Sequence, residues 1–423
     1  MIVSPSRIKH HIFDILGLDR MGKAYQMLVA GYIFMMFYFT FESVFINTLL
    51  YRVNDDGMRA VIIYRAIVYS MTAIFMQISA YLTQKISPLF TAKLGAFFYL
   101  MIFGAVLIGI DHMDILQYFI GIFSGIGGAF YWMAHSVMVP NYTTKHNRDA
   151  GISILGIIQG TMTLFVPILS GFVISFMPEI SGYRIMALVA MIMVIAHFIC
   201  MRKFHPVEQT TNQSKLKLAI KLISRKATFK LMFCYEFFRG VRDGTFAFFL
   251  NMLLFRIITD EGVIGINTFL TGIMAITGSW AYGKLVQQRT RFRYGIMSIT
   301  ILLIICTTLF FNMSIPTVML FTVVNAFMQL FFQYSYNNTS YDIIAQNKTS
   351  RKCTAEIVAI REFPIAAGRL CGLGITMIVP PTQRGYVQVM LLLTLSQYIA
   401  MLLVRHTLSL LERKKQKVEV EPV

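Results

Sequence analysis

The chain has 423 residues, of which 56% are hydrophobic and only 14% are charged, and its mean hydropathy is +0.64. An ordinary soluble domain carries roughly 25% charged residues, so this composition argues against a water-soluble fold. The formal net charge of +18 would suggest nucleic acid as the partner of a soluble protein. Here the basic residues lie mainly between apolar segments, so we expect anionic lipid headgroups as partner and no nucleic acid.

Residues 1–23 carry too many charges for the apolar region of a signal peptide. Ile8, Ile12, Ile15 and Leu16 follow helical spacing, which predicts a short cytoplasmic helix on the membrane surface. The segments that follow are long enough to cross a hydrocarbon core of roughly 30 Å. Twelve spans are predicted near residues 24–49, 59–83, 89–110, 115–139, 151–176, 183–202, 231–255, 261–285, 293–312, 315–340, 355–379 and 386–407.

The predicted spans fall into two groups of six. Residues 24–203 form the first predicted bundle and residues 231–407 the second, with a polar, basic linker at 204–230 and a tail at 408–423. Short cytoplasmic loops carry an excess of Lys and Arg, and most of the 38 basic residues share one side when both termini are cytoplasmic. The sequence therefore predicts an all-α membrane protein with twelve transmembrane helices and cytoplasmic termini.

An internal repeat relates the two halves. Asn47-Thr-Leu-Leu-Tyr-Arg52 at the end of the first span matches Asn251-Met-Leu-Leu-Phe-Arg256 at the end of the seventh. At nearly the same offset, Arg148 matches Arg351. Because each half has an even number of spans, both copies begin on the same side of the membrane, as in halves related by an axis along the membrane normal.

Charged side chains at membrane depth cost at least about 2.5–3.5 kcal/mol each, so we expect them to pair or to face a cavity. The seventh and eleventh spans carry most of them: Glu236, Arg239, Arg242, Asp243, Arg361, Glu362 and Arg369. Glu236, Arg239 and Asp243 share one helical face by their 3-and-4 spacing, whereas Arg242 points about 100° away from Asp243.

These charges match in depth across the two spans, Glu236 with Arg361 and Asp243 with Arg369. Two interpretations stay open. The groups form structural ion pairs within one half, or one carboxylate, Asp243 or Glu236, exchanges a proton and its pair is broken by substrate.

The first half carries fewer candidates. Glu42 and Arg65 lie at the same depth in the outer parts of adjacent antiparallel spans, which predicts an ion pair. The pair is a structural salt bridge, or Glu42 is a proton or cation-substrate site. His135 on the fourth span is a proton relay or a helix–helix hydrogen bonder.

Polar and aromatic side chains at membrane depth predict a substrate cavity, because lipid cannot satisfy so many amides. The amides of the tenth span line this cavity or hold helices together, and the aromatic residues suit an amphiphilic ligand. The predicted cavity residues are Tyr131, Trp132, His135, Gln159, Phe238, Gln329, Gln333, Tyr336 and Asn337.

Two parallel six-helix halves joined by a basic cytoplasmic linker resemble the major facilitator superfamily over nearly the whole chain. The segment from Gly160 to Gly171, with Pro167, is similar to a degenerate form of the Gly/Pro motif of the family's drug-and-proton antiporters. The loop from Ala80 to Pro88 departs from the family pattern, because it lacks the usual Gly and Asp. The resemblance implies alternating access and favours export.

The resemblance also implies a cytoplasmic gate. The loop from Asn141 to Asp149 is similar to polar, Arg-bearing loops of the family, and Arg351 occupies the matching position of the second half. The gate residues are Lys145, Arg148, Asp149 and Arg351.

The sequence lacks the common motifs of nucleotide-binding and metal-binding enzymes. The chain has no phosphate-binding Gly-x-x-x-x-Gly-Lys-Ser/Thr, no HExxH and no CxxC, and its five cysteines are scattered. We therefore expect no cofactor, no metal and no enzymatic activity.

The sequence thus predicts a plasma-membrane secondary transporter of a small organic molecule, with amphiphilic compounds favoured. Proton coupling and export are the expected mode, and a monomer is expected because one chain holds both bundles. The transport alternatives are a flippase for lipids or lipid-linked precursors and an uptake permease for sugars or peptides. Outside transport, the alternatives are a membrane sensor and an intramembrane enzyme.

Overall fold

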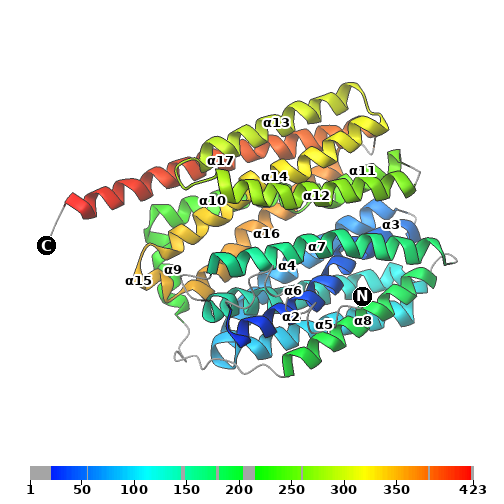
Figure 1. The fold of residues 1–423 in the computed structure, drawn as a ribbon, viewed down its shortest axis with the longest axis horizontal. Coiled ribbons are helices and arrows are strands. Elements are labelled where there is room, and N and C mark those ends of the chain that lie inside the picture. The colour runs from blue at the N-terminus through cyan, green and yellow to red at the C-terminus, as the bar shows by residue number, and fades with distance from the viewer. Residues whose placement is uncertain are drawn as a thin grey trace, which may run out of the picture. The chain divides into compact units, whose positions relative to one another are not determined.

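Helices make up every regular element in the part of the chain that the computed structural model describes (Figure 1). That part comprises residues 21–54, 56–143, 148–177, 181–202, 215–258, 261–379 and 382–420. The predicted surface helix near the N-terminus, the first part of the linker and Lys145 lie outside these ranges.

Contacts divide the chain into two compact units. The first consists of Met1–Ala60 and Ile78–Gln213, and the second of Val61–Gln77 and Ser214–Val423. The boundary near residue 213 falls in the predicted linker. The middle of the second span, residues 61–77, groups with the second unit, whereas the prediction assigned it to the first bundle.

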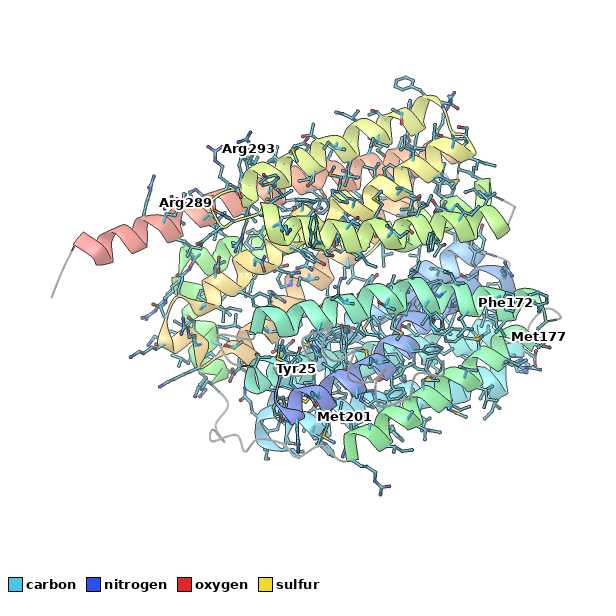
Figure 2. The ribbon with its side chains drawn as sticks, viewed as in Figure 1. Tyr25, Phe172, Met177, Met201, Arg289 and Arg293 are labelled. Carbon is cyan, nitrogen blue, oxygen red and sulfur yellow. The ribbon has the colours of Figure 1, made fainter. Side chains whose placement is uncertain are left out.

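The first unit is a bundle in which α5 packs against α6 and α8, and α2 packs against α7 and α8. Met201 of α8 lies over Gly31 of α2, where a Cβ would meet the methionine side chain (Figure 2). Its helices are α2 (Lys23–Phe41), the π-helical turn η2 (Glu42–Ile46), α3 (Asn47–Val53), the ends of α4 (Gly57–Lys85), α5 (Pro88–Gly109), η3 (Ile110–His112), α6 (Met113–Tyr142), α7 (Arg148–Ser175) and α8 (Ser181–Arg202).

Local capping chemistry fixes two helix starts in this unit. The Asp56 carboxylate accepts a hydrogen bond from the Arg59 backbone N–H at 3.2 Å, and α4 begins directly after it. Ser87 accepts from the Phe90 N–H at 3.0 Å, and Pro88 occupies the first turn of α5. Proline is favourable there because its missing N–H would have no partner within the helix.

The second unit is built around α10, which packs against α16 and α17, while α14 packs against α12 and α13. A short helix, α9, replaces part of the predicted linker, and α17 continues through the predicted tail. The elements are α9 (Leu216–Arg225), α10 (Ala227–Asp243), α11 (Phe246–Ile257), α12 (Glu261–Leu285), α13 (Arg291–Phe311), α14 (Ile315–Ala345), α15 (Lys348–Arg351), α16 (Thr354–Ile378) and α17 (Gln383–Val420).

The predicted seventh span, 231–255, is wrong as a single helix, because α10 ends at Asp243 and α11 begins at Phe246. A Cβ at Gly244 would collide with the side chain of Arg369 on α16. The Gly244 carbonyl accepts a hydrogen bond from the Tyr69 hydroxyl, at 2.6 Å. The approach of α16 and this side-chain hydrogen bond therefore interrupt the helix at a glycine.

Eight stretches of helix within the described ranges are long and apolar enough to cross a membrane. One of them, Pro88–Val139, covers two predicted spans. The remaining predicted spans, near 231–255, 261–285 and 355–379, are helical as well. The chain is therefore a multi-pass helical membrane protein, and the number of twelve spans stays a prediction.

Glycines bring α10 and α16 into close contact. A Cβ at Gly368 would lie against the Phe237 carbonyl oxygen, and a Cβ at Gly240 would lie against the Ile365 carbonyl oxygen. Both obstacles are backbone atoms, which cannot rotate away. Small residues of this kind let helix backbones approach in a membrane.

We expect Gly368→Ala to lower the melting temperature of the purified full-length protein, because overpacking costs about 1–3 kcal/mol. Gly374→Ala is the matched control on the same helix, since a Cβ there meets nothing within 4 Å. That variant should melt at the wild-type temperature or slightly above it, because alanine favours helix. Equal melting temperatures for the two variants would contradict the close contact.

Candidate functional site

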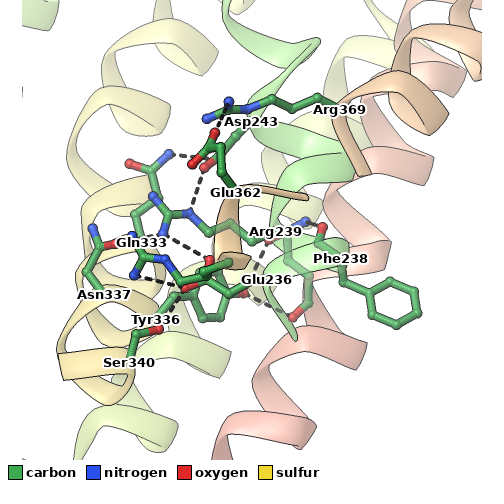
Figure 3. A network of polar contacts seen from close by, with 12 residues as sticks. Glu236, Phe238, Arg239, Asp243, Gln333, Tyr336, Asn337, Ser340, Glu362 and Arg369 are labelled. Atoms are coloured by element: carbon green, nitrogen blue, oxygen red, sulfur yellow. Dashed lines mark hydrogen bonds and ion pairs between the residues drawn. The ribbon is translucent and has the colours of Figure 1, made fainter. Parts of the chain in front are cut away.

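The candidate site is a network of charged and amide side chains between α10, α14 and α16, centred on Arg239 (Figure 3). The Arg239 Nε donates to Asp243 at 2.9 Å, and its NH1 group lies 3.2 Å from Glu236. The same NH1 group donates to the Asn337 side-chain oxygen on α14 at 2.6 Å. One guanidinium thus holds the two carboxylates that the 3-and-4 spacing placed on one face.

Glu236 is the buried end of the network, with no exposed surface. Its Oε1 accepts a hydrogen bond from the Ser340 hydroxyl at 2.7 Å and lies 3.5 Å from Arg361 of α16. Ser340 in turn is 2.7 Å from the Tyr235 hydroxyl. The predicted match of Glu236 with Arg361 is present in the structure.

Asp243 is the accessible end, because 14% of its side chain is exposed. Its second oxygen accepts a hydrogen bond from the Gln333 amide at 3.2 Å. The predicted partner Arg369 instead donates to Glu362 at 2.8 Å, two turns earlier on its own helix, and lies over the ring of Tyr69. The expected pairing of Asp243 with Arg369 is therefore wrong, because each group has a nearer partner on its own helix.

The network is electrically balanced. Its three carboxylates, on Glu236, Asp243 and Glu362, are matched by three guanidinium groups, on Arg239, Arg361 and Arg369. Buried ions are tolerated when they are paired and hydrogen-bonded, and the amides of α14 supply additional hydrogen bonds.

Arg242 lies outside this network. Its guanidinium donates to Asn325 on α14 at 2.7 Å and stacks over the rings of Phe246 at 3.8 Å and Phe332 at 5.0 Å. The sequence placed Arg242 among the ion-pair candidates, but in the described part of the chain it contacts an amide and two aromatic faces. Cation–π contact accounts for a charge that no carboxylate balances directly.

The amides of α14 have different roles. Gln333 and Asn337 join the network, whereas Asn338 donates to the Tyr282 hydroxyl on α12 at 3.2 Å. Tyr336 was predicted to line the cavity, but it is completely buried and its hydroxyl donates to Gln397 on α17 at 3.2 Å. Tyr336 therefore holds two helices together.

Other predicted cavity residues are scattered over the fold. Gln329 accepts a long hydrogen bond, 3.5 Å, from Asn325, and Gln159 is exposed on α7. The Phe238 carbonyl accepts from Gln397 at 2.8 Å, while its ring packs edge-on against Phe237. The network does not bring these residues together.

In the first unit, Glu42 is buried and lies in the π-helical turn that interrupts the first span. Ser124 of α6 donates a hydrogen bond to its Oε1 at 2.9 Å. Arg65 belongs to the segment that groups with the second unit, and its guanidinium lies 5.4 Å from the ring of Tyr64. The pairing of Glu42 with Arg65 stays a prediction.

His135 sits in an aromatic cluster on α6 and α2. Its ring stacks on Tyr32 at 5.0 Å, lies 6.1 Å from Tyr131 and meets Trp132 edge-on at 5.6 Å. Sequence reasoning missed a second imidazole: His197 of α8, which is fully buried, lies 5.7 Å from Tyr131. No spacing rule singles it out within an apolar helix.

The structure describes the side chain of one predicted gate residue, Arg351. Lys145 lies outside the described ranges, and Arg148 and Asp149 begin α7 with side chains that are not described. The Arg351 Nε donates to the Ala345 carbonyl at 2.9 Å, where α14 ends. A cation at a helix C-terminus is favourable, so this arginine has a structural contact of its own.

Sequence reasoning also missed Ser340. Its signal was present, because Gln333, Asn337 and Ser340 follow the same 4-and-3 spacing as the charges on α10. Within the described ranges, no group of three or more His, Cys, Asp or Glu side chains is arranged to hold a metal ion.

Comparisons with known proteins identify the fold. A model of the Major Facilitator Superfamily matches residues 98–360. The crystal structure of the human organic anion transporter MFSD10 (TETRAN) superposes with a TM-score of 0.66 and 11% identity, covering 90% of this chain and 98% of that one. An outward-facing bacterial homologue of the iron transporter ferroportin superposes with a TM-score of 0.67 and 13% identity, covering 92% and 100%.

A curated relative, the uncharacterized protein YqgE of Bacillus subtilis, is 23% identical over 334 residues, which is 78% of this chain and 76% of that protein. The predicted all-α transporter fold is thereby confirmed.

We expect Glu236→Gln to destabilise the protein strongly, because removing one partner of a buried ion pair costs about 3–5 kcal/mol. The matched control is Asp111→Asn, which breaks an ion pair at the surface. The Asp111 side chain is 61% exposed and that of its partner Arg184 is 43% exposed. Exposed pairs contribute at most about 1 kcal/mol. Thermal denaturation should separate the two variants, and a larger loss for Asp111→Asn would contradict the network.

Proposed function

Because the chain belongs to the major facilitator superfamily and has its transporter fold, we propose that it moves a small organic molecule across the plasma membrane by alternating access. Transport is driven by protons and runs in the direction of export. The motion is a rocking of two six-helix bundles, residues 24–203 and 231–407, within a monomer of twelve spans and cytoplasmic termini. The gate residues Lys145, Arg148, Asp149 and Arg351 belong to this proposal.

The observation that carries the proposal is the balanced network around Arg239. A proton or a substrate ion that binds to this network unbalances its charge and so changes its contacts. Asp243 is the proton-exchanging residue, because it is partly exposed while Glu236 is completely buried. Glu236 keeps Arg239 and Arg361 in place throughout the cycle.

Protonation of Asp243 removes the charge that holds the Arg239 Nε at 2.9 Å. Arg239 then loses its contact with Asp243 but keeps its hydrogen bonds to Glu236 and Asn337. A charged group of the substrate competes for the same atoms, so proton and substrate alter the same contact. Such competition couples two binding events in the sense of reciprocal linkage.

The substrate class rests on aromatic side chains that each unit carries separately. Trp132 and His135 of α6 belong to an aromatic cluster, and Phe238 lies on α10 beside the network. Flat aromatic side chains suit amphiphilic organic molecules. One structural neighbour is an organic anion transporter, which supports an organic molecule as the substrate.

Glu42 is the second proton site of the proposal. It is a buried carboxylate in the first unit, its carboxylate is bonded to Ser124, and it lies in a π-helical turn. Such turns within α-helices occur frequently at functional sites.

The test is proton-coupled transport by purified protein in proteoliposomes, with ethidium as an organic cation and fluorescein as an organic anion. We expect an imposed proton gradient to drive accumulation of at least one probe. Asp243→Asn should reduce gradient-driven accumulation at least tenfold yet retain exchange of the probe between the two sides. Gradient-driven accumulation is lost because the asparagine amide cannot take up and release the proton that the Asp243 carboxylate carries.

Asp111→Asn serves as the control and should transport as the wild type does. Glu42→Gln tests the first unit in the same assay. Full proton-driven transport by both Asp243→Asn and Glu42→Gln would refute the proposed coupling residues.

A further inference from the structure

Helix α9 is a cationic surface helix that the sequence pattern did not single out. Lys217, Lys221 and Arg225 lie on one face and are all exposed. Lys215 and Lys226 flank the helix, and no acidic residue occurs between positions 215 and 230. The helix therefore presents positive charge alone.

The other face of α9 is apolar and only partly covered. Ala219 at its centre is buried against the protein. Leu218 on one flank and Leu216 and Ile220 on the other remain 37%, 41% and 52% exposed. Apolar side chains thus continue on both sides of the buried strip, next to the cationic face.

Both ends of α9 are fixed to transmembrane helices. The Glu356 carboxylate of α16 accepts a hydrogen bond from the backbone N–H of Lys215 at 2.7 Å, where α9 begins. A carboxylate at this end is favourable because of the helix dipole. At the other end Lys226 alone, in an extended conformation, separates α9 from α10.

With the predicted orientation of the chain, these contacts put α9 at the cytoplasmic face. The positive-inside rule assigns the N-terminal ends of α10 and α16 to that side, and α9 contacts both helices. A helix that combines an exposed cationic face with exposed apolar flanks matches an anionic membrane surface. A soluble acidic partner would match the charges but leave the flanks uncovered.

We propose that α9 is a binding element for anionic phospholipids of the cytoplasmic leaflet. Lys217, Lys221 and Arg225 bind the phosphate groups, and Leu218 and Ile220 contact lipid on the two flanks of this cationic face. Because α9 is tied to α10 and α16, bound lipid stabilises the two helices that carry Glu236, Arg239 and Arg361. The proposal does not depend on the identity of the substrate.

The experiment uses the full chain reconstituted in phosphatidylcholine vesicles, with or without phosphatidylglycerol. We expect phosphatidylglycerol to raise the melting temperature of the wild type and to remain bound in native mass spectra. The triple variant K217Q, K221Q and R225Q should lose at least half of that rise and most of the bound lipid. Its melting temperature in phosphatidylcholine alone should equal that of the wild type, which establishes that it folds.

The matched control is the pair R289Q and R293Q, which removes two exposed arginines, one from the turn before α13 and one from the first turn of α13 (Figure 2). This pair should keep most of the rise in melting temperature and most of the bound lipid. L218Q with I220Q tests the apolar flanks and should weaken lipid retention without changing the net charge.

An undiminished response to phosphatidylglycerol in the triple variant would overturn the proposal. So would an equal loss in the control pair, since net charge would then explain the effect. Binding of an acidic peptide through α9 without any response to phosphatidylglycerol would also overturn it.

Discussion

The fold of the second unit depends on the compensation of charge inside a membrane protein. Arg239 lies between Glu236 and Asp243 on one face of α10, and this face must turn toward groups that complete its hydrogen bonds. The amides of α14 and Arg361 of α16 are those groups. This requirement sets the orientation of α10 about its own axis, and the orientation in turn determines which helices α10 packs against.

Glycines make the compensation geometrically possible. Arg361 is close to Glu236 only because Gly240 and Gly368 let α10 and α16 approach at backbone distance. The same approach places the Arg369 side chain against Gly244 and ends α10 there. One constraint therefore accounts both for the ion pair and for the break that divides the seventh span into α10 and α11.

Features that depend on helical periodicity could be predicted from the sequence. Features that depend on contacts with residues elsewhere in the fold could not. The 3-and-4 spacing predicted that Glu236, Arg239 and Asp243 share a face, and hydropathy predicted a helical membrane protein. Which acid Arg369 binds depends on the rotamer of Glu362 two turns away, and the end of α10 depends on Tyr69, a residue far away in sequence. Helix α9 was hidden because its charges resemble those of a linker.

The two ends of the network differ in a way that assigns them different roles. Glu236 is bonded to Arg239, Ser340 and Arg361 without contact with solvent, so neutralising it would leave buried cations uncompensated. Within the described residues Asp243 contacts Arg239 and Gln333 and is partly exposed, and in the proposed mechanism it changes charge while Glu236 preserves the structure. The proposed mechanism gives these two roles to two carboxylates that contact the same guanidinium, and the 3-and-4 spacing places them about one helical turn before and after Arg239.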